Sequence, residues 1–135
     1  MLALSTLPHY LPIGILIARP IPGFAGHSVG YAAVIGISTT LSAVWHYLGE
    51  PDGAILYADY AMALAWSLYS LLLMQERKRS KVPHYFPFEI AVGCMNLVIS
   101  FGTQNRLLEY KIWHSIWHIL SAIKSIYIVW ILSYS

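Results

Sequence analysis

The sequence predicts an all-α integral membrane protein: a helical bundle of about five transmembrane helices that forms a single domain over residues 1–135. Hydrophobic residues make up 58% of the chain and charged residues only 10%, whereas a soluble domain usually carries about 25% charged residues. Five Trp and ten Tyr add the aromatic excess that is typical of proteins at membrane interfaces. Several apolar stretches also approach the roughly 20 residues that a membrane helix needs.

The apolar stretches cover about residues 1–18, 25–48, 54–74, 86–103 and 112–133. The first is short and contains Pro8 and Pro12. Each boundary has a local reason. The segments RPIPG (19–23) and GEPDG (49–53) carry strong turn signals. The polar segments QERKRSKVP (75–83) and TQNRLLEYK (103–111) separate the last three stretches, so we expect consecutive helices to alternate in direction.

The distribution of basic residues predicts the orientation in the membrane. Four cationic residues lie in one loop: Arg77, Lys78, Arg79 and Lys81. Because cytoplasmic loops of membrane proteins carry an excess of Lys and Arg, this loop is predicted to be cytoplasmic, with the N-terminus outside or lumenal and the C-terminus cytoplasmic. The N-terminus lacks a Lys/Arg-rich start, so no cleaved signal peptide is expected. A net charge of +2 is too small to indicate a nucleic-acid partner.

Ionisable side chains from three of the stretches are predicted to lie at one depth. His114 and His118 are four residues apart, so they share one face of a helix. His46 lies near the end of the second stretch, and Asp59 lies near the start of the third. At a rise of 1.5 Å per residue, these side chains fall roughly 5–15 Å to the outer side of the midplane. Ionisable groups inside a membrane are costly, which makes a shared depth informative.

Three imidazoles and a carboxylate at one depth indicate a metal site. Zinc accepts neutral histidine nitrogens, and three protein ligands with one open position are typical of a catalytic site. Water at the open position has its pKa lowered to about 7. Asp59 is then placed to take the proton, and Ser42 to form a hydrogen bond with the water or with the developing oxyanion. A haem fits less well, because its two axial ligands approach from opposite faces.

Five residues together resemble the signature of the CREST superfamily of membrane hydrolases, which includes alkaline ceramidases, adiponectin receptors, GPI-remodelling hydrolases and myomaker relatives. They are Ser42-x-x-x-His46, Asp59 and His114-x-x-x-His118, and the order and spacing of these motifs match. The resemblance implies a Zn²⁺ held by the three histidines in a hydrolase that acts on lipid amides. Family members look like seven-helix bundles, so this chain resembles a reduced member, a fragment, or a protein that completes its bundle as a homo-oligomer.

Other interpretations remain open for these residues. The His114/His118 pair can be explained as packed histidines bonded to backbone or serine, and Asp59 as an interfacial carboxylate that reaches water. The Ser42 hydroxyl can donate a hydrogen bond to a backbone carbonyl of the preceding helical turn, which needs no functional role. A non-enzymatic alternative is a receptor-like or membrane-remodelling protein in which the metal site is structural. A haem-binding electron-transfer bundle is a third hypothesis.

The remaining polar residues in or near the apolar stretches are predicted to play lesser roles. Three histidines are expected at the membrane interfaces: His9, His27 and His84. Glu89 is expected to reach the headgroups, and Asn96 to form a hydrogen bond between helices. Lys124 lies deep in the last stretch and has no obvious partner in the sequence.

Overall fold

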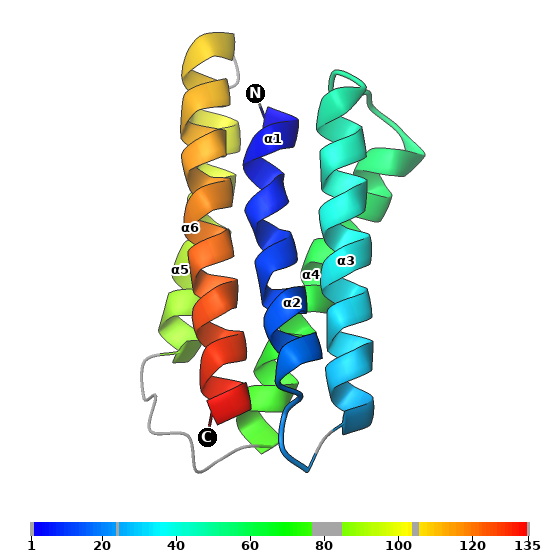
Figure 1. Ribbon diagram of the computed structural model, residues 1–135. Coiled ribbons are helices and arrows are strands. Elements are labelled where there is room, and N and C mark those ends of the chain that lie inside the picture. Colours follow the sequence, from blue (N-terminus) through cyan, green and yellow to red (C-terminus); the bar gives the residue numbers. More distant parts are fainter. Residues whose placement is uncertain (1, 24, 77–84, 104–105, 135) are drawn as a thin grey trace.

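The molecule is a bundle of helices that run side by side, and no strand occurs in the part of the chain that the structure describes (Figure 1). The computed structural model describes residues 2–23, 25–76, 85–103 and 106–134. The elements are α1 (Leu2–Thr6), η1 (Leu7–Tyr10), α2 (Leu11–Ala18), α3 (Ala25–Tyr47), α4 (Ala54–Glu76), α5 (Tyr85–Gly102) and α6 (Leu107–Tyr134). The two termini lie at opposite ends of the bundle (Figure 1). The predicted all-α helical bundle is confirmed.

The first apolar stretch is a broken helix that lies between α3 and α6. The segments α1, η1 and α2 follow one another with a 3₁₀ turn in the middle, and Pro8 and Pro12 each lie in the first turn of a segment. Proline has no backbone N–H and clashes with the preceding turn, so the chain tightens at these points instead of continuing as one regular α-helix. This short helix contacts both α3 and α6, so it buries one face between them while side chains such as Leu4 and Ile17 stay exposed.

Three helices are long and apolar enough to cross a membrane: α3, α4 and α6. Their mean hydropathies are 1.3, 1.3 and 1.6, and the apolar helices Leu2–Ala18 and Glu89–Ile99 are shorter. These lengths and compositions support a membrane protein. Helix α6 begins at Leu107, five residues before the predicted start of the last stretch. The basic residues 77–81 lie outside the described part of the chain.

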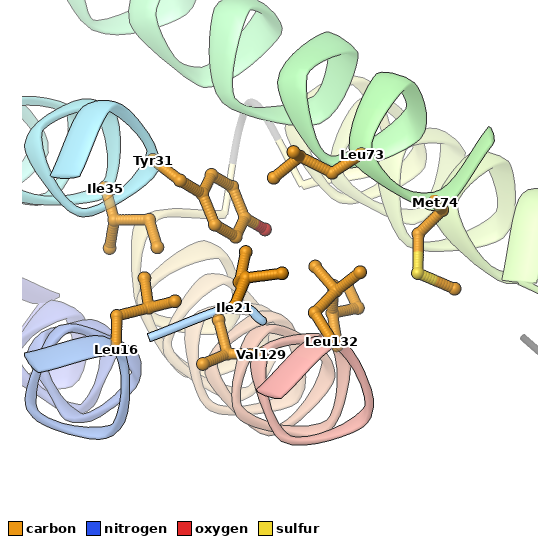
Figure 2. Close-up of a cluster of buried hydrophobic side chains, with 9 residues drawn as sticks. Leu16, Ile21, Tyr31, Ile35, Leu73, Met74, Val129 and Leu132 are labelled. Carbon is orange, nitrogen blue, oxygen red and sulfur yellow. The ribbon is translucent and has the colours of Figure 1, made fainter. Parts of the chain in front are cut away.

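The apolar core occupies the end of the bundle that contains the C-terminus (Figures 1 and 2). Tyr31 and Ile35 of α3 meet Leu73 of α4 and Val129 and Leu132 of α6 there. The Tyr31 hydroxyl also forms a 2.6 Å hydrogen bond with the hydroxyl of Ser70. Buried tyrosines usually have a hydrogen-bond partner for the hydroxyl, and Ser70 provides it here, so this polar group is not left unpaired in the apolar core.

Helices α5 and α4 flank α6 and α3 respectively, and a polar cavity lies between these elements toward the other end of the bundle. Helix α5 packs against α6, while α4 packs mainly against α3. All four helices and the N-terminal segment contribute side chains to the cavity wall. Its volume is about 100 Å³. A cavity of this size has room for several water molecules.

Candidate metal centre

Three buried histidines, one from the end of α3 and two from the first half of α6, converge in the space between these helices. One nitrogen from each of His46, His114 and His118 lies within 4.8 Å of the other two. The Nε2 atoms of His46 and His118 are only 2.9 Å apart. All three rings pack edge to face, with centroids 4.8–5.1 Å apart. The predicted convergence of these histidines is therefore present, and the group could hold a metal ion.

The placement of His114 and His118 follows from the buried stripe of α6. Positions 114, 118, 121, 125, 128 and 132 of this helix are all buried, which is the spacing of three or four residues that defines one helix face. The stripe is polar in its first half and apolar in its second half. The two histidines therefore enter the bundle, while the neighbouring Trp113 and Ile116 are exposed.

A tight turn after α3 brings an acidic residue back to His46. Gly49 has φ 85°, and the backbone N–H groups of Gly49 and Glu50 donate to the carbonyls of His46 and Trp45 at 3.3 and 3.0 Å. This pair of bonds is the Schellman arrangement, which ends a helix with a glycine in the left-handed region. The indole N–H of Trp45 also donates to the carbonyl of Pro51 at 3.0 Å and holds the turn against the helix.

Glu50 is a site residue that the sequence interpretation missed. The Nδ1–H of His46 donates to the Oε1 of Glu50 at 2.9 Å, since a carboxylate only accepts. The proton on Nδ1 leaves a lone pair on Nε2, the atom that faces the other histidines. Burial raises the pKa of the Glu50 carboxyl, but the hydrogen bond to His46 and the nearby imidazoles outweigh it and leave that pKa below its ordinary value. The signal in the sequence was the four-residue spacing of His46 and Glu50.

The donor set fits a divalent metal. The Nδ1 atom of His114 is buried and has no hydrogen-bond partner among the described residues, and an orphaned ring nitrogen inside a histidine cluster is what an absent cation leaves behind. In tetrahedral coordination with Zn–N bonds of 2.0–2.1 Å, ligand nitrogens lie about 3.3 Å apart. The separations in the cluster, 2.9 Å and up to 4.8 Å, bracket that spacing. Small rotations of the three imidazole rings would bring their nitrogens to this tetrahedral spacing.

Asp59 and Ser42 lie in the wall of the cavity onto which His114 and His118 also open. Asp59 is buried, with 7% of its surface exposed, and its carboxylate interacts with the side chain of Ser42. This burial argues against the alternative in which Asp59 reaches water at the surface. Four of the five residues singled out in the sequence thus line one cavity, and the fifth, His46, contacts His118.

His9 also lies in the cavity wall, so its prediction as an interfacial residue is wrong. It is buried at 4% exposure, and its Nδ1–H donates to the carbonyl of Thr6 at 2.9 Å. Its ring packs edge-on against those of His118 and Trp66. The broken first helix packs between α3 and α6 with one face buried, and His9 lies on that buried face. His27, by contrast, is exposed and is hydrogen-bonded to Tyr69, and His84 lies outside the described residues.

The structure corrects the prediction for Glu89 and shows the partner of Lys124, for which the sequence left headgroup and cavity positions open. The Lys124 ammonium donates to the Oε1 of Glu89 at 2.7 Å, and the two side chains are 10% and 6% exposed. Glu89 therefore turns into the bundle and does not reach outward to headgroups. Both residues lie in the cavity wall, as does Asn96, whose carbonyl oxygen has no hydrogen-bond partner within the described ranges. The hydrogen bond between helices that was predicted for Asn96 is therefore not made by this oxygen.

The arrangement can bind a cation and place a carboxylate and a hydroxyl in the wall of the adjoining cavity. Because the ligand nitrogens converge on one point, they suit a single ion better than the opposed axial positions of a haem. No protein-family model, curated protein or solved structure matches this chain, so the side chains themselves carry the functional assignment.

Proposed function

We propose that this protein is a membrane-embedded, zinc-dependent hydrolase of a lipid amide or ester. The observation that carries the proposal is the cluster of three buried imidazoles at the end of a cavity that also contains Asp59 and Ser42. The resemblance of these five positions to the CREST superfamily favours the amide class. The apolar helices around the cavity favour a lipid as the substrate.

His46, His114 and His118 would hold the zinc, and Glu50 would keep the His46 ring in the tautomer that coordinates. When bound, zinc supplies Lewis acidity that polarises a carbonyl and lowers the pKa of water. Asp59 accepts the proton of the attacking water and returns it to the leaving group. Ser42, which contacts Asp59, orients that carboxylate or donates to the oxyanion as it develops. Burial of Asp59 strengthens these interactions because water competes less.

Asp59→Asn provides the main test of this proposal. Asparagine keeps the size of the side chain but cannot take a proton, so hydrolysis of a fluorescent N-acyl amide by the protein in nanodiscs should fall about 10²–10⁴-fold. Zinc content, measured by elemental analysis, should stay at the wild-type level. The His114→Ala/His118→Ala variant should lose both zinc and turnover. Equal zinc in that double variant and in the wild type would refute the metal assignment.

A structural metal site is the second candidate. The Nε2 atoms of His46 in α3 and His118 in α6 are 2.9 Å apart, so an ion bound there would cross-link the two helices. In this case the protein would be receptor-like or membrane-remodelling, and the ion would have a structural role. The same Asp59→Asn variant separates the two candidates. In the structural case the variant would keep its metal and show little functional loss.

The membrane arrangement that accompanies this proposal has five crossings. Consecutive helices alternate in direction, which would place the N-terminus outside or lumenal and the C-terminus in the cytoplasm (Figure 1). In sealed right-side-out vesicles, we expect a protease added outside to remove an N-terminal tag and to leave a C-terminal tag intact. Removal of both tags from intact vesicles would contradict this orientation.

A further inference from the structure

The end of the cavity away from the histidines contains a charged pair that the proposed reaction does not use. Lys124 lies six residues after His118 and ten after His114 on the same helix. At a rise of 1.5 Å per residue, these separations are about 9 and 15 Å along the helix axis. Its partner Glu89 comes from α5, and both residues lie in the wall of the cavity that contains the histidines.

Stability alone does not account for this pair. Two charges removed from water lose their hydration, and replacement of a buried ion pair by apolar residues of similar volume is often neutral or stabilising. Ionisable residues inside membrane helices are rare for the same reason, and they commonly mark the path or the binding site of a ligand. The position of Lys124 and Glu89 in a cavity wall, and not in the apolar core, agrees with a role in binding.

Two more polar atoms in the cavity wall have no hydrogen-bond partner within the described ranges. They are the hydroxyl oxygen of Thr39 and the side-chain carbonyl oxygen of Asn96. Thr39 is only 3% exposed, so its hydroxyl faces the cavity and not the lipid. A ligand that fills the cavity with hydrocarbon alone would keep these atoms unpaired, which is unfavourable for each of them.

We propose that Lys124, Glu89 and Thr39 form a second subsite, which binds a neutral hydroxyl or amide group carried by the lipid about 9–15 Å from the group held at the histidine cluster. Asn96 lies seven residues from Glu89 along α5, about 10 Å toward the histidines, and therefore lies outside this subsite. The subsite deepens the proposed function, because it rests on a lipid occupying the cavity. It selects chains with a polar group at that distance over plain alkyl chains of the same length.

The charges at the subsite favour a neutral group over an ionic one. Lys124 and Glu89 cancel each other at 2.7 Å, so an anion or a cation would have to displace one partner of the pair. A hydroxyl can accept from the ammonium and donate to the carboxylate without breaking the pair. A site that forms hydrogen bonds to a substrate hydroxyl strongly rejects the analogue that lacks it, because its own polar groups then remain unpaired.

The test compares the binding of two twelve-carbon amides to the full chain in nanodiscs: dodecanamide and ω-hydroxydodecanamide. An extended chain of this length spans about 14 Å with ordinary carbon–carbon bonds, which matches the distance to the subsite. Binding is measured on the zinc-loaded protein as the shift in melting temperature with ligand concentration, and the amount of intact amide is quantified after each scan. The hydroxylated amide should bind about ten- to a hundredfold more tightly to the wild type.

The Lys124→Met/Glu89→Leu double variant should lose this preference, and Thr39→Val should reduce it. Lys111→Met, which removes an exposed lysine of the same helix, should keep it. Equal binding of both amides to the wild type, or binding of neither, would overturn the proposal. If the double variant does not fold, an unchanged preference in Thr39→Val overturns it as well. If the protein clearly prefers the hydroxylated amide but never hydrolyses amides, the subsite proposal is supported and only the proposed hydrolase activity is refuted.

Discussion

At the scale of single residues, the chemistry of the cluster depends on which nitrogen of His46 carries the proton. The 2.9 Å hydrogen bond to Glu50 places that proton on Nδ1, so the Nε2 lone pair faces His118. A carboxylate behind a histidine ligand also makes the imidazole a stronger donor to a metal. Glu50 thus acts through His46 and touches neither substrate nor ion.

Replacement of Glu50 by Gln should therefore weaken metal binding. Glutamine can still accept the hydrogen bond but carries no charge, so we expect zinc affinity to fall about 10–100-fold. Competition with a chromophoric chelator measures this change. Asp52→Asn removes an exposed carboxylate from the same loop and should leave the affinity unchanged. Equal losses in both variants would show that the general charge of the loop, and not the contact with His46, sets the affinity.

At the scale of elements, α6 joins the two ends of the molecule. Its buried face carries His114, His118 and Lys124 in the cavity, and then Ile128 and Leu132 in the apolar core. Polar side chains on a membrane helix are tolerated where neighbouring helices or a cavity satisfy them. Helix α5 provides Glu89 as the partner of Lys124. The Val92 carbonyl of α5 also accepts a 2.8 Å hydrogen bond from the indole N–H of Trp117 in α6.

The Lys124–Glu89 pair should show a strong energetic coupling between α5 and α6. Lys124→Met alone removes the ammonium that lies 2.7 Å from a buried carboxylate and should lower the free energy of unfolding by about 3–5 kcal/mol. Adding Glu89→Leu should recover most of that loss, because no charge then remains in the interior. Thermal and denaturant unfolding in detergent, followed by circular dichroism, measures both values. Additive losses in the double variant would mean that the two side chains do not interact.

At the scale of the whole molecule, the bundle has an apolar end and a polar end. The apolar core holds α2, α3, α4 and α6 together at one end, whereas the contacts of the other end enclose a cavity. A bound ion would cross-link α3 to α6 at that polar end. Metal binding and the stability of the fold are therefore expected to be coupled.

Zinc should raise the melting temperature of the protein, because a ligand that binds only the native state stabilises it by about 2.7 kcal/mol at a hundred times its Kd. The His114→Ala/His118→Ala variant should show no zinc-dependent shift, and magnesium, which prefers oxygen ligands, should have no effect on the wild type. Differential scanning fluorimetry in detergent measures each shift. A zinc-dependent shift of the same size in the double variant would place the ion elsewhere.

Local patterns in the sequence were enough to predict the helices and the depth of the principal residues. Apolar length and composition predicted the stretches, prolines and glycines predicted their ends, and the constant rise per residue predicted that His46, Asp59, His114 and His118 share a level. Depth along a helix depends only on residue number. It can therefore be calculated without any knowledge of which helices are neighbours.

The tertiary structure alone decided the contacts that depend on the rotation of each helix and on its neighbours. The broken N-terminal helix packs between α3 and α6, which brings His9 beside the cluster, and α5 turns Glu89 toward Lys124. The return of Glu50 to His46 depended on the turn at Gly49. Rotation and neighbour choice are set by the packing of all helices at once, so no single stretch of this sequence contains that information.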